Sequence, residues 1–359
     1  MRIFQILPSF VSGDAIGNEV IMFDNILRNH GFETYIFYEN ATDYTKSISY
    51  HYSLLPKINL DDLVIFHMSI SSIITEIFLE MKCKKIMIYH NITPYNYYYG
   101  YDINMTIACK KGLEEVRFLF DKVDYCITHS IFSKKNLENI GYLCKIDVMP
   151  ILLSFDDYKE DPSKIIINKF SDDFINIVSI GRINAPNKRW ENIIKVFYFF
   201  QKYIESKSRL FLVGTFESNE VYPQRLKNFV NYLKLNNVIF TGHIPFNELL
   251  SYLKISDIYL CMSEHEGFCV PLLEAMFFNI PVVAYSTTAI PYTLENAGFL
   301  IKNHNPLEVA FIMKKILEDN SLHQEIIKNQ KKRMSYFETK RVSKIFMNYI
   351  DNFLKNNYA

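Results

Sequence analysis

The stretch Ser263-Glu264-His265-Glu266-Gly267-Phe268-Cys269-Val270-Pro271-Leu272-Leu273-Glu274-Ala275 decides the fold of the second half of the chain. The apolar run Ile258–Met262 comes before it and predicts a strand. Pro271 is typical of a first helical turn, because its position needs no N–H group. We therefore predict a strand, a glycine-containing loop and a helix over Pro271–Asn279. The free backbone amides at the start of such a helix suit an anion.

Two carboxylates flank this predicted anion site, Glu266 in the loop and Glu274 in the helix. Carboxylates repel phosphates, so we expect these two to accept hydrogen bonds from sugar hydroxyls beside a phosphate. A nucleotide sugar offers both kinds of group. Taken singly, Glu274 is equally compatible with a role at the helix dipole and Glu266 with an exposed loop. The combination favours the nucleotide sugar.

Composition narrows the class of protein. The 359 residues suffice for two domains, and 49% hydrophobic with 22% charged residues fits a soluble globular chain. Lys+Arg and Asp+Glu both number 39, which argues against a nucleic acid partner. Six cysteines without C-x-x-C spacing indicate reduced thiols and a cytoplasmic location. The sequence contains no apolar run long enough for a membrane span.

The chain alternates apolar strands with amphipathic helices twice, which predicts two doubly wound α/β domains with parallel sheets. We expect the domains at 1–160 and 161–337, with a linker in the charged segment between Pro150 and Asp173. The amphipathic residues 338–359 predict a C-terminal helix that returns to the first domain. The predicted strands are 3–7, 34–37, 63–66, 85–89, 125–128, 145–148, 175–180, 210–213, 238–240, 258–262, 282–285 and 299–301. The predicted helices are 18–30, 72–81, 105–120, 133–139, 190–205, 223–234, 247–253 and 271–279.

Other α/β enzymes are excluded by missing motifs. The eleven glycines form no G-x-G, as a dinucleotide site needs, and no G-x-x-x-x-G-K, as a P-loop needs. There is no Asp-x-Asp pair for the cation of a metal-dependent transferase. No His/Cys cluster has metal-ligand spacing either. We therefore expect no cofactor and no required metal.

Ligands of parallel sheets bind beyond the carboxyl ends of the strands, so the loops after the strands are candidate sites. After the first strand, the glycines let the backbone approach a ligand, and Asn18 is a candidate helix cap. His67 and His90 each follow a predicted strand and could orient an acceptor hydroxyl or serve a structural role. The sequence does not decide which histidine acts. In the loop after the first strand, the candidate ligand-binding residues are Gly13, Asp14 and Gly17.

The segment after the strand at 85–89 is rich in tyrosine. Five tyrosines in the seven residues 95–101 cannot all be core, and tyrosine suits sugar rings because it has an apolar face and a polar tip. We expect acceptor binding by His90, Asn91, Tyr95 and Tyr97. The first domain also carries several lysines, which are compatible either with a solvated surface or with peripheral membrane contact.

The loop after the strand at 175–180 carries two cations, Arg182 and Lys188. Both are placed to neutralise a diphosphate, the arginine as a fork and the lysine as a point charge.

The acidic stretch resembles a known family. Glu266 and Glu274, with seven residues between them, resemble the E-x7-E motif of retaining GT-B glycosyltransferases of family 4. The run E-G-F-C-V-P-L-L-E-A-M is similar to that family's E-G-F-G-x-P-x-x-E-A-M. The resemblance implies that Glu266 contacts the donor sugar and Glu274 the ribose. It also implies donor contacts from Gly267, Phe268, Cys269 and Val270.

Further segments resemble the same family. Gly181–Lys188 is similar to G-R-L-x-x-x-K-x, whose Arg and Lys contact the donor diphosphate, and Thr241–Pro245 resembles a nucleobase loop, which adds His243 and Ile244 as candidates. The resemblance implies that the loop after the first strand, with Gly13, Asp14 and Gly17, faces the donor phosphate and sugar, although it departs from the family's usual Gly-Gly pair. The resemblance is strong over residues 175–302 and loose before residue 120.

The resemblance implies a metal-independent, retaining hexosyltransferase of bacterial surface polysaccharide synthesis, such as O-antigen, capsule or lipopolysaccharide. Its donor would be GDP-mannose or a UDP-sugar, and its acceptor a saccharide, most often lipid-linked. It would act in the cytoplasm, with peripheral contact at the inner membrane as an option. The alternative is a non-catalytic scaffold or regulatory subunit with the same fold.

Overall fold

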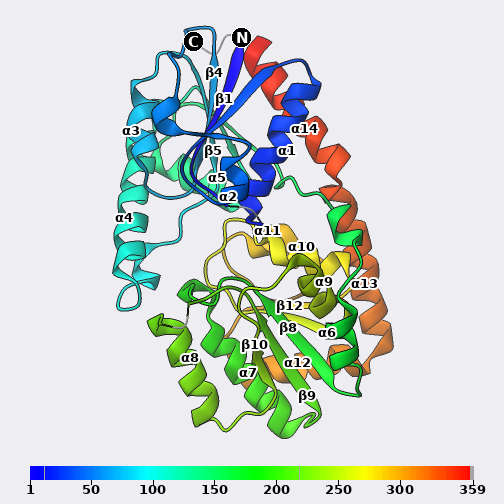
Figure 1. Cartoon of the computed structure of the whole chain (residues 1–359). Helices are drawn as coiled ribbons and strands as arrows, with labels where there is room; N and C mark the ends of the chain where they lie inside the picture. Colours follow the sequence, from blue (N-terminus) through cyan, green and yellow to red (C-terminus); the bar gives the residue numbers. More distant parts are fainter. Residues whose placement is uncertain (12, 218, 356–359) are drawn as a thin grey trace. The chain divides into compact units, whose positions relative to one another are not determined.

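The computed structural model describes residues 1–11, 13–217 and 219–355, which form two compact units (Figure 1). Unit 1 consists of residues 1–96, 104–154 and 337–359, of which 356–359 lie outside the described part. Unit 2 consists of residues 97–103 and 155–336. Each unit is built around its own parallel sheet.

The sheet of unit 1 has seven strands in the order β3-β2-β1-β4-β5-β6-β7, and every pairing is parallel. Because the order reverses between β1 and β4, the strands wind outward in both directions, as expected for a doubly wound sheet. The strands are β1 (Arg2–Phe10), β2 (Glu33–Ala41), β3 (Tyr50–His51), β4 (Leu63–Met68), β5 (Lys84–Tyr89), β6 (Tyr125–Thr128) and β7 (Lys145–Val148).

Helices cover both faces of this sheet, α1 and α14 on one side and α3 and α4 on the other (Figure 1). On the first face, Phe23 of α1 stacks on Phe346 of α14 with ring centroids 4.0 Å apart, within a core that includes Ile65 and Ile88. The predicted return of the C-terminal helix to the first domain is confirmed. The helices are α1 (Ala15–Asn29), α2 (Asp43–Lys46), α3 (Ile73–Glu80), α4 (Ile103–Phe118), α5 (Ile131–Ile140) and α14 (Thr339–Lys355).

Three local predictions in unit 1 are wrong. β4 runs to Met68, so His67 lies inside a buried strand rather than after it. Asn18 lies within α1, whose N-cap is Asp14. The helix predicted over 133–139 begins earlier, at Ile131, and Ser130 caps it, because the Ser130 hydroxyl accepts a hydrogen bond from the Ser133 amide at 3.1 Å.

The sheet of unit 2 has six parallel strands in the order β10-β9-β8-β11-β12-β13. β8 and β11 are neighbours, and the order reverses between them. The loops that follow these two strands therefore start from adjacent positions, where ligands of doubly wound sheets bind. The strands are β8 (Ile175–Ile180), β9 (Ser208–Val213), β10 (Val238–Phe240), β11 (Ile258–Cys261), β12 (Val282–Tyr285) and β13 (Phe299–Ile301).

The helices of unit 2 include several that periodicity did not predict, among them α12 and α13. The core on one face joins α7 and α12 through residues such as Phe197 and Met313. On α13, Gln330 donates to the Ile280 carbonyl at 2.8 Å, which ties this helix to the end of α10. The helices are α6 (Lys164–Lys169), α7 (Trp190–Tyr203), α8 (Val221–Tyr232), α9 (Phe246–Lys254), α10 (Val270–Phe277), α11 (Ile290–Leu294), α12 (Pro306–Glu318) and α13 (Asn320–Met334).

The segment 150–173, predicted as a linker, is partly regular. The boundary between the units falls after Ser154, and α6 follows within unit 2. α6 is anchored on α9, since the Ser163 amide donates to the Asn247 carbonyl at 3.1 Å. Within the described residues, no helix combines the length and the apolar character that a membrane crossing requires.

Candidate functional site

The first candidate site lies at the carboxyl ends of β8 and β11 in unit 2. Asn187, in the loop after β8, joins this loop to the acidic stretch after β11. Its side-chain amide donates to the His265 carbonyl at 2.9 Å, and its own carbonyl accepts from the Glu264 amide at 2.8 Å. Two hydrogen bonds therefore hold the predicted diphosphate loop against the predicted sugar loop.

This junction brings together two of the predicted residues, Lys188 and Glu266. The Lys188 Nζ atom lies 2.7 Å from Glu266 Oε1, and both side chains are largely buried. Burial lowers the pKa of Lys188, but the Glu266 carboxylate more than offsets this, so the pKa lies above its ordinary value. The Glu266 carboxylate therefore favours the charged form of the lysine.

Glycine is required directly after β8 and directly after β9. Gly181, the residue after β8, has φ +152°, and an added Cβ would lie 3.1 Å from Lys188 Cε. At Gly214, a Cβ would lie 1.8 Å from the Gly181 carbonyl oxygen. The backbone therefore leaves just enough room for the aliphatic part of Lys188 to run beside it.

The acidic stretch ends at the start of α10. Cys269 is the N-cap with φ +76°, a left-handed conformation that glycine adopts most readily, and Val270 is the first helical residue. The loop is held in place from the next helix, since the Thr293 hydroxyl donates to the Phe268 carbonyl at 2.6 Å. The Glu266 amide donates to the Thr288 hydroxyl at 2.9 Å. Gly267 lies between these two anchored positions.

Glu274, one turn into α10, is buried and has its own partner. Its Oε1 atom accepts a hydrogen bond from the Tyr158 hydroxyl at 2.8 Å. Burial raises the pKa of Glu274, and the Tyr158 hydrogen bond acts in the opposite direction. Tyr158 itself lies among aromatic rings, with Phe246 at 5.2 Å and Phe277 at 5.8 Å between centroids.

The remaining predicted residues of unit 2 lie at its surface. Arg182 is exposed, and its backbone carbonyl accepts from the Trp190 indole at 3.1 Å. His243 is exposed and Ile244 half-buried, in the loop between β10 and α9. The structure therefore joins Lys188 to Glu266 directly, whereas Arg182 has its side chain in solvent.

In unit 1, the predicted donor residues surround the start of α1. Gly13 has φ +81° and Asp14 is the exposed N-cap of the helix. Gly17 is buried, and a Cβ there would lie 2.2 Å from the Val11 carbonyl oxygen. Gly17 therefore allows the helix to begin directly against the end of β1.

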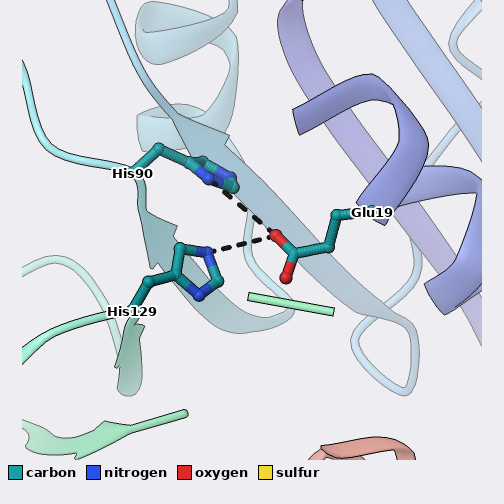
Figure 2. Close-up of side chains that lie close together, drawn as sticks. All are labelled: Glu19, His90 and His129. Carbon is teal, nitrogen blue, oxygen red and sulfur yellow. Dashed lines mark ion pairs between the residues drawn. The ribbon is translucent and has the colours of Figure 1, made fainter. Parts of the chain in front are cut away.

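A cluster of buried polar side chains lies behind this helix, and Figure 2 shows three of its members, Glu19, His90 and His129. Glu19 comes from α1, while His90 and His129 directly follow β5 and β6. Glu19 Oε2 lies 3.1 Å from His129 Nε2 and 3.9 Å from His90 Nδ1. The two candidate histidines also meet, because His67 Nδ1 lies 3.1 Å from His90 Nε2.

Burial governs the charge of these histidines. It lowers the pKa of His67 to about 3 and places that of His90 well below its ordinary value, so both rings are neutral near pH 7. Burial also lowers the pKa of His129, but the Glu19 carboxylate outweighs it, and the net shift is upward.

The predicted acceptor residues are divided between the units. Asn91 belongs to unit 1, has φ +71° and donates to the Ser133 hydroxyl at 3.0 Å. Tyr95 is exposed and also belongs to unit 1. Tyr97 belongs to unit 2, where the Arg189 guanidinium lies 5.5 Å from its ring centroid.

Sequence reasoning missed several residues of both clusters. His129 was identifiable by the rule that selected His90, because it also ends a parallel strand. Asn187 lies inside a loop that was already selected. Nothing in the sequence marked Glu19, in mid-helix, or Tyr158, which is distant from Glu274 along the chain.

These features define the class of the protein. Two doubly wound α/β units match the GT-B architecture of glycosyltransferases. Residues 161–333 match the family model of glycosyl transferases group 1.

Relatives of the chain carry related descriptions. It is 29% identical over 60% of its length to an uncharacterised glycosyltransferase of Methanocaldococcus jannaschii, of which it covers 55%. It is 23% identical to the capsular polysaccharide biosynthesis glycosyltransferase CapM of Staphylococcus aureus, with 61% of this chain and 60% of that protein covered. It is also 23% identical over 47% of its length to the serotype-specific mannosyltransferase WbdA of Escherichia coli.

The chain spans only part of these relatives: about half of the first, and 21% of WbdA. Among solved structures, Anabaena HepE in complex with UDP and glucose superposes with a TM-score of 0.75 at 16% identity, covering 98% of this chain and all of that one. At this identity, the superposition establishes the fold alone.

Proposed function

We propose that the protein is a retaining glycosyltransferase that moves a hexose from a nucleotide sugar to a saccharide acceptor. The buried Lys188–Glu266 pair at the start of α10 is the observation that carries the proposal. It places a positive charge and a carboxylate that can accept from hydroxyls 2.7 Å apart, in the loops that precede α10, and a helix N-terminus favours an anion. A diphosphate and a sugar that are joined to each other match this arrangement.

In the proposed reaction, the acceptor hydroxyl oxygen attacks the anomeric carbon of the donor on the side of the leaving group. The bond from that carbon to the phosphate oxygen breaks, and the hydroxyl proton passes to this oxygen. Negative charge develops on the departing nucleoside diphosphate, where Lys188, Arg182 and the amides near Cys269 and Val270 would stabilise it. Transfer needs no metal in this scheme.

The two acids would have separate roles. Glu266 would hold the sugar hydroxyls and Glu274 the ribose, while His243 and Ile244 would present backbone groups to the base. The loop of Gly13, Asp14 and Gly17 would face the donor phosphate and sugar. Asn91, Tyr95 and Tyr97 would contact the acceptor, and His90, whose side chain is only 3% exposed, would hold the start of this segment in place.

The descriptions of the relatives support a class of substrate. The chain resembles glycosyltransferases described for capsular polysaccharide and for a mannose-containing serotype, so the product would be a bacterial surface polysaccharide. The donor would be GDP-mannose or a UDP-sugar, and the acceptor a lipid-linked saccharide. Such a reaction takes place in the cytoplasm, at the inner face of the membrane.

A screen of nucleotide sugars tests the proposal. The true donor should raise the melting temperature of the purified protein by mass action, and the protein should slowly hydrolyse it without acceptor. Lys188→Ala and Arg182→Ala should each cut this hydrolysis sharply, whereas Lys195→Ala, an exposed lysine on α7, should not. Near-normal rates in both site variants would refute the diphosphate assignment. Absence of any donor binding would favour a non-catalytic subunit.

A further inference from the structure

The cluster in unit 1 has a feature that sugar transfer does not use. Three donor atoms, Glu19 Oε2, His90 Nδ1 and His129 Nε2, all lie within 4.8 Å of one another (Figure 2). The Glu19 side chain is fully buried, and those of His90 and His129 are only 3% and 4% exposed. The protonation of these three atoms decides what the cluster can bind.

The tautomer of His129 follows from its other nitrogen. His129 Nδ1 lies 3.1 Å from the Met149 carbonyl oxygen, which can only accept a hydrogen bond. Nδ1 therefore carries a proton, and in the neutral ring the Nε2 atom presents a lone pair toward Glu19. The second oxygen of Glu19 is already fixed, because it accepts from the Leu152 amide at 2.8 Å.

The tautomer of His90 follows from a longer chain that begins at Gln5. The Gln5 amide nitrogen donates to the Val20 carbonyl at 3.2 Å, so its oxygen faces His67 Nε2 at 3.1 Å and accepts from it. His67 is fully buried with no carboxylate against it, so it is neutral and its Nδ1 accepts from His90 Nε2. The proton of His90 is then on Nε2, and its Nδ1 presents a lone pair to Glu19.

With His129 neutral, three lone pairs, one of them on a carboxylate, converge in a buried space. The Glu19 carboxylate favours a proton on His129, which would offset the charge, but the 3.1 Å contact between Glu19 Oε2 and His129 Nε2 does not have hydrogen-bond geometry. A buried carboxylate oxygen and a buried imidazole nitrogen in such contact without a hydrogen bond are costly. A cation between the three atoms would satisfy all of them.

We propose that Glu19, His90 and His129 form a site for a divalent transition-metal ion of the zinc type. Two imidazole nitrogens and one carboxylate oxygen are ligands that zinc favours, whereas Mg²⁺ and Ca²⁺ favour oxygen alone. Zinc at about 2.0–2.1 Å from each atom in tetrahedral geometry separates its ligands by about 3.3 Å. The distances of 3.1 and 3.9 Å lie on either side of this value.

The hydrogen bonds of the remaining ring nitrogens and of the second carboxylate oxygen also support a zinc site. Ligating histidines usually donate their second ring N–H group to a carbonyl, a carboxylate or another fixed acceptor. His129 donates to a backbone carbonyl and His90 to His67, and the remaining oxygen of Glu19 is held by a backbone amide. The ion would join α1 to the ends of β5 and β6. Its role is structural and does not depend on the donor site in unit 2.

Zinc and cobalt binding to the whole chain test the site. We expect the chelator-treated protein to take up one Zn²⁺ per chain and to melt several degrees higher with it. Co²⁺ should give visible bands of four-coordinate nitrogen and oxygen ligation. A near-ultraviolet thiolate-to-cobalt band would instead assign the metal to cysteines and overturn the proposal. Absence of uptake and of any thermal shift would overturn it as well.

Two conservative variants separate ligation from hydrogen bonding. In His129→Gln, the side-chain amide can still donate to Glu19 but is a poor ligand, and Glu19→Gln removes the charge. Each should lower zinc affinity by more than the roughly 10- to 100-fold lost with an outer-shell partner. Because each variant is compared with and without chelator, reduced stability does not hide the result. His51→Gln, at a histidine bonded only within its own turn, should bind as the wild type does. Equal zinc affinity in all four proteins would overturn the assignment.

Discussion

The buried carboxylates in the two polar clusters, one around Lys188 in unit 2 and one around Glu19 in unit 1, are compensated in different ways. In unit 2, each carboxylate has its own partner, Lys188 for Glu266 and Tyr158 for Glu274. In unit 1, one carboxylate faces two imidazoles whose protons are committed elsewhere. A paired site can exchange its internal partners for those of a ligand, whereas a cluster with an excess of acceptors needs a cation. The paired site of unit 2 suits a substrate that binds and dissociates, and the cluster of unit 1 suits a permanently bound ion.

The largest effect expected concerns Lys188. Lys188→Met should lower turnover about 10²- to 10³-fold, the loss typical when one group that stabilises transition-state charge is removed. It should also destabilise the fold, because Glu266 is left buried without its partner.

The double variant Lys188→Met/Glu266→Gln separates the two effects. It should regain most of the stability, since no unpaired charge remains, but none of the turnover. Urea unfolding and donor hydrolysis of the single and double variants measure this. If turnover returned together with stability, the pair would be structural only.

The next effect concerns the other cluster. Glu19→Ala should cost about 3 kcal/mol of unfolding free energy, because it leaves the Leu152 amide and His129 without their partner in a dry environment. Urea unfolding in the presence of a chelator measures the protein without bound metal. Glu138→Ala, which removes an exposed carboxylate 3.8 Å from Lys134, should cost less than about 0.5 kcal/mol. Similar losses in the two variants would mean that the buried cluster contributes little.

The same comparison explains what could be predicted from sequence. The residues of the donor cluster lie in two short segments of the sequence, so their charges, the glycine and the start of the helix were visible as a pattern. The alternation of strands and helices predicted that both segments lie at the same edge of one sheet. The histidine cluster draws Gln5, Glu19, His67, His90 and His129 from five separate elements. Only strand order and exact side-chain direction bring such residues together. α12 and α13 were missed because no predicted strand follows them to mark where they end.

A smaller effect concerns the pH dependence of stability at one histidine of unit 2. Burial lowers the pKa of His265 to about 4, below the ordinary value of 6.5. The unfolded chain therefore binds a proton between pH 6.5 and 4 that the folded protein excludes, so the contribution is present above 6.5 and is lost as pH falls toward 4. From pH 7.5 to 5, this amounts to about 2 kcal/mol.

Removal of the imidazole tests this assignment. His265→Gln should flatten the decline of unfolding free energy between pH 7.5 and 5, whereas His243→Gln, at an exposed histidine, should leave the decline unchanged. Denaturant unfolding at a series of pH values measures both. An unchanged slope in His265→Gln would contradict the burial argument.

The smallest effect concerns the hydroxyl that holds Glu274. Tyr158→Phe keeps the ring among Phe246 and Phe277 but removes the 2.8 Å hydrogen bond, so stability should fall by about 1 kcal/mol. If Glu274 binds the ribose, the variant should also raise the KM for the donor with little change in kcat, because ribose is bound equally in the ground and transition states. Tyr198→Phe, at a half-buried tyrosine of α7 that accepts an exposed hydrogen bond from Lys202, is the matched control and should change neither constant. A fall in kcat at unchanged KM would place Tyr158 and Glu274 beside the reacting atoms instead of the ribose, and would remove the division of roles between the two acids.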